Sequence, residues 1–264
     1  LCTFQSNGLG ALFKEKRHIS KSFCNGQYAL AGVSAAMMAA AGLEGAEDVI
    51  GERAGILEAW GAKGEAEAVT RGLGKDWAIS GANFKFINAG YPIHAAVEAA
   101  STLAASHGIS ADTIESVLVG MPAKAMRVVD NRDMHNICVQ DMVGAALVLG
   151  RLSLRDLPFP ALLDHPLFKQ VRQRIQVDVD PALNLEQPEG RGARVTITTR
   201  GGAEMSRCVK APRGHSSRGD ITWSDLSEKW HDGLPNCDVD QALALARRLE
   251  ELDDIRQLTA LFST

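Results

Sequence analysis

Ala193-Arg-Val-Thr-Ile-Thr-Thr-Arg-Gly-Gly-Ala-Glu-Met-Ser-Arg-Cys-Val209 is the stretch that decides the fold class of this 264-residue chain. Two runs that favour β-structure, 193–199 and 203–209, flank the pair Gly201-Gly202. A glycine pair between two such runs is typical of a tight hairpin turn, because glycine adopts positive φ angles without steric cost. The stretch therefore predicts an antiparallel β-hairpin in the C-terminal half of the chain.

Upstream of the hairpin, strands and helices are mixed. The run Thr113 to Val119 places apolar residues among polar ones and predicts a strand. Ile175, Val177 and Val179 alternate with polar residues, which is typical of a half-buried strand. Between these two runs we expect helices over 137–149 and 165–174. With the hairpin, this middle part of the chain contains about four or five strands.

The N-terminal part is helical by composition, with one short exception. Gln27 to Ala41 predicts a helix that ends at Gly42, and short helical segments follow to about residue 73. The exception is a strand predicted over 83–87. Pro92 then opens a helix that runs to about residue 106 and ends at Gly108.

Helices return after the hairpin. We expect them over 222–230, over 239–249 with Asp238 as the N-cap, and over 254–262. The order of helices, mixed segment and helices predicts an α+β fold, in which an α+β domain is inserted into an all-helical domain formed by both ends of the chain.

The predicted boundaries lie near Gly81 and Pro212. They divide the chain into a first helical part, 1–81, an α+β domain, 82–212, and a helical return segment, 213–264.

Composition excludes several classes of function. A net charge of −4 and 14 aromatic residues (8 Phe, 4 Trp, 2 Tyr) do not form the basic surface that nucleic acid requires, so no nucleic-acid partner is expected. The apolar run from Ala29 to Ala41 is too short to cross a membrane, so no membrane partner is expected.

Five cysteines are an odd number, and they are scattered without a Cys-x-x-Cys pair. This pattern indicates a reducing compartment, which we take to be the cytoplasm, and predicts neither a metal site nor a cofactor. The chain opens at Leu1 without a methionine or a signal peptide, so we expect it to be a piece of a longer protein.

Two segments carry candidate chemistry. Lys21 precedes a helix of small residues, and Lys85 precedes the helix that holds His94 in its first turn. Two cations and a histidine at helix-entry loops suit a site that binds several carboxylates and handles a proton. Taken singly, each residue has an ordinary interpretation, as a surface lysine or a structural histidine.

Other motifs are weaker candidates for a functional site. The loop Asp130-Asn-Arg-Asp-Met-His135 has residue types that bind metals, but its spacing matches no known ligand set, and we expect a solvated loop. Gly214-His-Ser-Ser-Arg-Gly219 has a composition that can cradle an anion on backbone N–H groups, yet no strand-to-helix pattern surrounds it. No motif supports a serine hydrolase or a zinc protease.

Taken together, the segments resemble the MmgE/PrpD family, whose members include 2-methylcitrate dehydratase, cis-aconitate decarboxylase and iminodisuccinate epimerase. The resemblance rests on Lys21-x-x-x-x-Gly26-x-x-Ala29-x-x-Gly32, on the stretch 47–55, and on Phe84-Lys85 with His94-Ala-Ala-Val-Glu-Ala nine residues after the lysine. It covers nearly all of the chain.

The resemblance implies an active site in the cleft between the helical and α+β domains, with Lys21, Lys85 and His94 on family positions. Where relatives have a tyrosine in a later helix, this chain has Asp141, which becomes the fourth candidate. Relatives also have a long N-terminal helical portion with further catalytic residues that this chain lacks. We therefore expect the chain to be active only with that portion or with a partner.

The predicted function is that of a cofactor-independent lyase, a dehydratase or decarboxylase of a small di- or tricarboxylic acid of the methylcitrate or cis-aconitate type. Lys21 and Lys85 act as electrostatic clamps in this hypothesis, and His94 transfers a proton. The alternatives are an epimerase or isomerase of a dicarboxylic acid and a non-catalytic subunit or paralogue. The predicted partners are a polycarboxylate substrate and either a second copy of the chain, in a homodimer, or a polypeptide that supplies the N-terminal helices.

Overall fold

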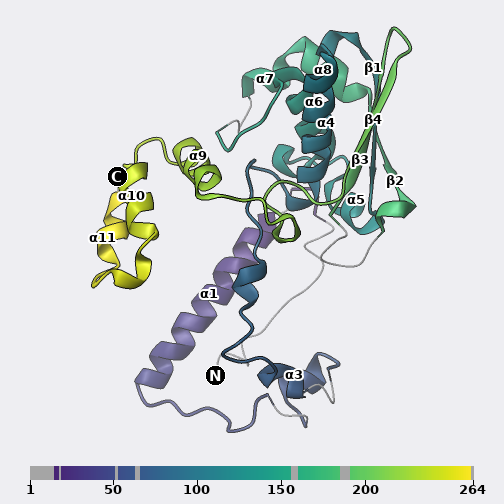
Figure 1. The fold of residues 1–264 in the computed structure, drawn as a ribbon. Coiled ribbons are helices and arrows are strands. Elements are labelled where there is room, and N and C mark those ends of the chain that lie inside the picture. The colour runs from purple at the N-terminus through teal and green to yellow at the C-terminus, as the bar shows by residue number, and fades with distance from the viewer. Residues whose placement is uncertain are drawn as a thin grey trace. The chain divides into compact units, whose positions relative to one another are not determined.

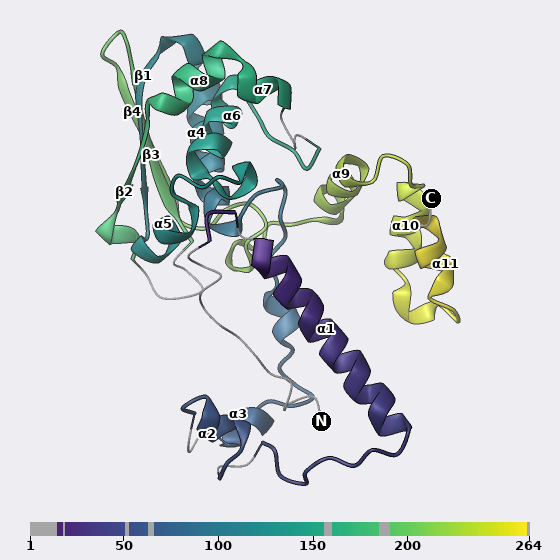
Figure 2. The same ribbon diagram turned by 180° about the vertical axis from the view of Figure 1, so that it is seen from behind.

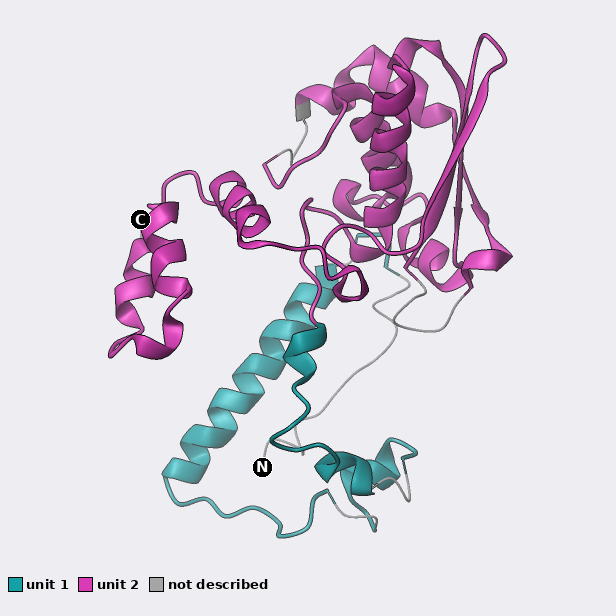
Figure 3. Cartoon of the chain, in the orientation of Figure 1, with its two compact units in different colours: residues 1–81 teal, residues 82–264 magenta. Residues whose placement is uncertain are grey.

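The computed structural model describes residues 15–17, 19–50, 53–62, 66–155, 160–184 and 191–262. The chain forms two compact units, residues 1–81 and 82–264, which Figure 3 shows in different colours. The predicted division into a helical part, 1–81, an α+β domain, 82–212, and a helical return segment, 213–264, stays a prediction.

The first unit is helical within its described residues. Its helices are α1 (Ile19–Ala40), α2 (Ile56–Ala59) and α3 (Ala66–Thr70), and a short 3-10 helix covers Ala78–Gly81. The helix predicted from Gln27 is confirmed as part of the longer α1. Gly42 follows it with φ +90°, the backbone conformation that the sequence placed at this C-terminus.

The core of the second unit is a four-stranded sheet with the strand order β2-β1-β3-β4. The strands are β1 (Ile114–Met121), β2 (Ile175–Val179), β3 (Ala193–Thr199) and β4 (Glu204–Val209). The hairpin predicted from the sequence is confirmed, since β3 and β4 pair antiparallel from Ala193 opposite Val209 to Thr198 opposite Glu204. Strand β1 pairs antiparallel with β3 and parallel with β2.

Helices cover one face of this sheet. The second unit contains α4 (His94–His107), α5 (Ala123–Val129), α6 (Val139–Leu149), α7 (Pro160–Asp164) and α8 (Pro166–Gln173). In Figures 1 and 2, α4, α6 and α8 lie on the same side of the strands. Helix α4 contacts both β3 and α6. The mixture of helices with one sheet confirms the α+β class.

Alternation along the strands explains why the helices pack on only one face. Ile114, Val117 and Val119 of β1 are fully buried, whereas Leu118 between them is 42% exposed. Helix α4 is buried almost all round and consists largely of alanine, so its backbone can approach both the sheet and α6 closely. The apolar core of the unit therefore surrounds the helix that begins with His94.

Three helices follow the sheet: α9 (Trp223–Gly233), α10 (Val239–Ala246) and α11 (Arg256–Thr259). They match the three helices predicted there, and the Asp238 side chain accepts from the Gln241 N–H as the predicted N-cap.

The strand predicted over 83–87 is wrong. This segment has no ladder partner and instead hydrogen-bonds to a loop through single contacts, such as Phe84 N–H to Gly214 O at 2.8 Å.

Candidate active site

The four predicted site residues belong to different elements. Lys21 lies in α1 of the first unit and is exposed, so its relation to the other three stays a prediction. In the second unit, Lys85 lies in the irregular segment before α4, and His94 is the first residue of α4. Asp141 lies in the first turn of α6.

His94 is a buried, neutral imidazole. His94 is only 4% exposed, and its Nε2 has no hydrogen-bond partner among the described residues. Burial, together with the positive charge of Lys85, lowers the pKa of His94 from 6.5 to about 4, although a hydrogen bond with the Ala89 backbone acts in the opposite direction. The ring is therefore uncharged at neutral pH and has an unused nitrogen.

Lys85 faces the same backbone carbonyl as His94. Its Nζ donates to Ala89 O at 3.0 Å, while the remainder of the residue is exposed. The charge of Lys85 acts on His94, so the structure brings together these two residues that the sequence singled out. An ammonium group beside a neutral imidazole is an arrangement that favours an anionic ligand.

The loop 210–219 packs against the segment that precedes α4, and it contains the stretch 214–219 that the sequence analysis considered as a weak anion-binding candidate. Gly214 has φ +86°, and a Cβ at this position would lie 2.3 Å from Phe84 O. Only glycine permits this approach without a shift of backbone. The close contact places Arg213 on one side of the glycine and His215 on the other, next to the start of α4.

Glu98, one turn after His94, accepts hydrogen bonds from both arginines of this loop. Its Oε2 accepts from the Arg213 backbone N–H at 2.6 Å, and its Oε1 accepts from Arg218 Nη1 at 2.8 Å. The Arg213 guanidinium also lies 4.2 Å from the centre of the Phe86 ring. These contacts fix cationic side chains close to the first two turns of α4.

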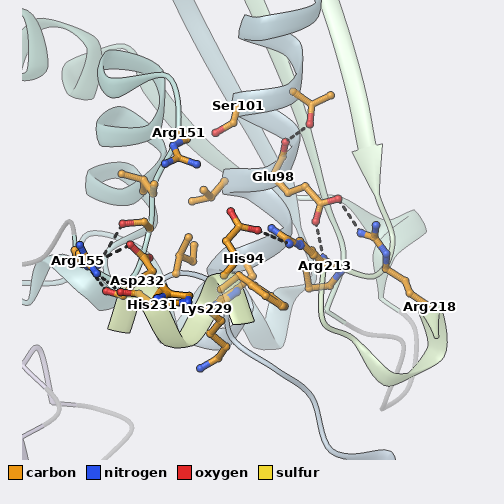
Figure 4. A pocket seen from close by; sticks show the side chains of 18 residues that line it. His94, Glu98, Ser101, Arg151, Arg155, Arg213, Arg218, Lys229, His231 and Asp232 are labelled. Atoms are coloured by element: carbon orange, nitrogen blue, oxygen red, sulfur yellow. Dashed lines mark hydrogen bonds and ion pairs between the residues drawn. The ribbon is translucent and has the colours of Figure 1, made fainter. Parts of the chain in front are cut away.

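A cavity of about 550 Å³ opens beside these residues (Figure 4). Its wall comes from α4, from the segment after α6, from the loop 210–219 and from α9. Its charged lining residues, together with His94, are Glu98, Arg151, Arg155, Arg213, Arg218, Glu228, Lys229 and Asp232. A volume of this size is typical of pockets for small-molecule ligands.

The cavity wall has an excess of positive charge, with five cationic side chains against three carboxylates. Arg213 pairs with Glu228 at 3.2 Å, and Arg155 pairs with Asp232 at 3.6 Å. Within the described residues, Arg151 and Lys229 have no ion-pair partner. Two cations that border the cavity are thus unpaired within the described residues.

Asp141 does not line this cavity. Its side chain is 5% exposed, forms an ion pair with Arg172 Nε at 2.5 Å and is hydrogen-bonded to His135 Nδ1 at 2.6 Å. Burial alone would lower the pKa of Arg172, but the hydrogen bond and the charge of Asp141 outweigh burial and raise it. The network joins α6 to α8 and to the 3-10 turn His135–Ile137 that precedes α6. The geometry therefore favours a structural role, while the predicted catalytic role stays a prediction.

Residues 88–251 match the MmgE/PrpD C-terminal domain. This match covers more than half of the chain, so the chain belongs to the MmgE/PrpD family, as the sequence resemblance predicted. Members of the family include dehydratases and other lyases, which suggests a function of that type for this domain. No curated protein matches the chain.

Two other findings concern the chain's surroundings. None of the described helices is long and apolar enough to cross a bilayer. In the described part of the chain, Cys24, Cys138, Cys208 and Cys237 are free thiols, whereas Cys2 lies outside the described residues.

Arg151, Lys229, Tyr91 and His215 are residues near His94 that the sequence analysis did not select. Lys229 follows Arg151 by more than seventy residues, and no motif links them. The aromatic ring of Tyr91 lies 5.3 Å from that of His94 and 6.4 Å from that of His215, centre to centre. His215 stands in the stretch 214–219, which the sequence analysis considered only for anion binding, and the adjacent Gly214 is the residue that permits the close packing.

Proposed function

We propose that this chain forms the substrate-binding part of a cofactor-independent lyase, a dehydratase or decarboxylase of a small di- or tricarboxylic acid. The observation that carries the proposal is the cavity in which the unpaired cations Arg151 and Lys229 share a wall with the neutral imidazole of His94. Family membership supports the reaction class, and the charge of the cavity supports the substrate class.

Cations near the substrate carboxylates serve binding and chemistry together. Removal of a proton or of CO2 next to a carboxylate leaves negative charge on the adjacent carbon, and dehydration develops the same charge when the proton leaves ahead of the hydroxyl group. Fixed positive groups lower the energy of that charge most effectively in a site shielded from water. We assign this role to Arg151 and Lys229 in the cavity and to Lys85 beside His94, and we retain Lys21 as a further clamp.

His94 is the proposed proton acceptor. In the protein without ligand its pKa is about 4, so the ring is available as a base at neutral pH but is a weak one. A bound polycarboxylate brings negative charges toward the ring and raises its pKa, which makes the base stronger when substrate is present. Burial is the main cause of the low pKa of His94, and the charge of Lys85, which adds to it, is compensated when a polycarboxylate binds.

The proposed partners are the substrate and a second polypeptide, either another copy of the chain or one that supplies N-terminal helices. Helix α1 supports such a partner because its apolar side chains are exposed, among them Phe23 at 66%, Val33 at 60% and Met37 at 68%. Sedimentation analysis of the chain by itself tests the first alternative, since a strictly monomeric protein at all concentrations would contradict a homodimer.

A binding experiment tests the substrate class. We expect the tricarboxylate tricarballylate to bind the chain in isothermal titration calorimetry, and the double variant Arg151→Gln/Lys229→Gln to bind it at least roughly tenfold more weakly, because each charged hydrogen bond is worth about 1.5–3 kcal/mol. The matched control, Lys124→Gln/Arg207→Gln, removes two exposed charges outside the cavity wall. Equal losses in the two double variants would remove the cavity from the proposal.

One observation favours a non-catalytic subunit or paralogue as the second candidate. The Asp141 carboxylate, at a position where relatives have tyrosine, is occupied by Arg172 and His135. Restoring tyrosine at this position in the assembled protein distinguishes the candidates. A gain of turnover from an inactive parent would favour the non-catalytic paralogue, and turnover by the parent protein favours the lyase.

A further inference from the structure

Glu98 is a partly buried carboxylate on the face of α4 that also presents His94. The two residues are four positions apart, which puts them on one side of a helix, and both line the cavity. The Glu98 side chain is 27% exposed, and both of its oxygens accept: Oε2 from the Arg213 N–H at 2.6 Å and Oε1 from Arg218 Nη1 at 2.8 Å (Figure 4). Glu98 therefore ties the loop 210–219 to α4 at two points.

The same loop holds the segment 83–86 that precedes α4. The Gly214 carbonyl accepts from the Phe84 N–H at 2.8 Å. Two residues further on, the Ser216 N–H donates to the Asn83 side-chain oxygen at 2.7 Å. The loop thus fixes the backbone of this segment by hydrogen bonds at two successive residues.

Lys85 lies between residues that the loop contacts. The residue before it is hydrogen-bonded to the loop, and the Arg213 guanidinium lies 4.2 Å from the centre of the Phe86 ring after it. The Lys85 ammonium group donates to Ala89 O at 3.0 Å, the carbonyl to which His94 also hydrogen-bonds. The loop therefore holds the backbone on both sides of Lys85, and the charge of Lys85 is directed to the start of α4.

These contacts form a closed circuit that runs from α4 through the loop 210–219 to the segment 83–86 and back to α4. Glu98 is the point at which the loop is fastened to the helix. Its two hydrogen bonds involve an ionised carboxylate, and such bonds are roughly twice as strong as those between neutral groups. Because the Glu98 side chain is mostly shielded from water, solvent screens the pair with Arg218 less than it screens an exposed ion pair.

We propose that Glu98 is a positioning residue that holds Lys85 beside His94 through the loop 210–219. A lysine side chain on an unfastened segment would spread its charge over many positions. A cation that is already in place stabilises developing negative charge without reorganisation during the reaction. We rest the consequence for catalysis on the proposed function, whereas the position of Lys85 can be measured without any substrate.

The pKa of His94 reports the position of Lys85, because the charge of Lys85 adds to the effect of burial on this ring. NMR titration of the 264-residue chain follows the imidazole directly. Glu98→Gln keeps the size of the side chain, but its NH2 group cannot accept from the donors of the loop. If Lys85 then moves away, the proton affinity of His94 should increase at least roughly threefold. Loss of the Glu98 charge alone acts in the opposite direction, since removing a nearby anion lowers the pKa of a histidine.

Asn83→Ala loosens the same circuit without any change of charge. It removes the side-chain acceptor of the Ser216 N–H from an exposed residue, so the fold should tolerate it. We expect the proton affinity of His94 to increase in this variant as well. This second variant decides the matter even if Glu98→Gln does not fold.

Asp180→Asn is the matched control. Like Glu98, Asp180 accepts from an arginine and from a backbone N–H, here Arg194 Nε and the Ala182 N–H, both at 3.0 Å. Asp180 does not line the cavity beside His94. The control loosens a comparable tether elsewhere and should leave the titration of His94 unchanged.

A double-mutant cycle with Lys85→Met identifies the route of the effect. In that background no cation is left at position 85, so Glu98→Gln should no longer increase the proton affinity of His94. An equal increase in both backgrounds would show that Glu98 acts on the burial of the ring and would overturn the proposal. A decrease in Glu98→Gln with Lys85 present, or an equal increase in Asp180→Asn, would overturn it too.

Turnover tests the function separately. In the native assembly supplied with methylcitrate and cis-aconitate, Glu98→Gln should lower kcat at least roughly tenfold and change KM less, while Asp180→Asn changes neither. An unchanged kcat in Glu98→Gln would overturn the role of this positioning in catalysis. An unmodified assembly that converts no polycarboxylic acid contradicts the proposed function, and the titration of His94 still decides whether Glu98 positions Lys85.

Discussion

Replacement of His94 with glutamine should remove a pH-dependent part of the stability of the chain. The pKa of this buried ring is about 4 in the folded protein, against 6.5 for an ordinary histidine, which is the value expected after unfolding. Protons therefore bind the unfolded chain more readily. The corresponding stability is present above about pH 6.5 and is lost as the pH falls toward 4.

The size of the effect follows from these two pKa values. Because one pKa unit corresponds to about 1.4 kcal/mol, the full difference is roughly 3 kcal/mol, of which roughly 2.5 kcal/mol is lost by about pH 4.5. Urea unfolding at about pH 7.5 and about pH 4.5 measures it, provided that the slope with urea is the same for each protein. The unmodified chain should lose about 2.5 kcal/mol more between these pH values than His94→Gln.

His107→Gln is the control for this experiment, because it removes an exposed imidazole from the other end of the same helix. It should show the pH dependence of the unmodified chain. If His94→Gln and the unmodified chain lose the same stability on acidification, then His94 is not a buried neutral imidazole, and its assignment as the base in the cavity fails with it.

Three other predictions concern Asp141, Lys85 and metals. Asp141→Asn should lower the free energy of unfolding by about 2–3 kcal/mol in calorimetry, because it leaves Arg172 and His135 without their partly buried partner; lost turnover at an unchanged melting temperature would instead support a catalytic role. Lys85→Met should reduce turnover in the complete assembly by orders of magnitude at nearly unchanged melting temperature, since Lys85 is exposed and donates to one carbonyl in the site, Ala89 O; normal turnover would remove Lys85 from the site. Activity should survive exhaustive chelation, and a loss that one metal restores would overturn the cofactor-free assignment.

The parts of the fold that the sequence predicted well are those set by local patterns. The hairpin of β3 and β4 depends on a glycine pair between two strand-forming runs, and α4 depends on Pro92 near its start and Gly108 at its end. These signals act over a few residues. The prediction of a strand over 83–87 was wrong. An apolar run of this kind resembles a strand in sequence even when, as here, it packs against a loop and pairs with no neighbouring strand.

The candidate site was predictable only in part. Lys85 and His94 lie nine residues apart in one segment, so the sequence analysis could select both of them. The contacts of His215 with the segment before α4 join residues more than a hundred positions apart, through Gly214 and Phe84. The pairing of Asp141 with Arg172 has the same character, since it depends on how α6 packs against α8. No local pattern encodes such contacts.

The most direct test of the proposed lyase is a turnover assay on the protein in its native assembly. Methylcitrate and cis-aconitate are supplied, dehydration is followed by the absorbance of the new carbon–carbon double bond next to a carboxylate, and decarboxylation is followed by the release of CO2. We expect turnover that falls by orders of magnitude in His94→Gln and in Arg151→Gln/Lys229→Gln, but not in Lys124→Gln/Arg207→Gln. Turnover that survives the first two substitutions, or an assembly that converts no polycarboxylic acid, would contradict the proposal that this cavity is a lyase site.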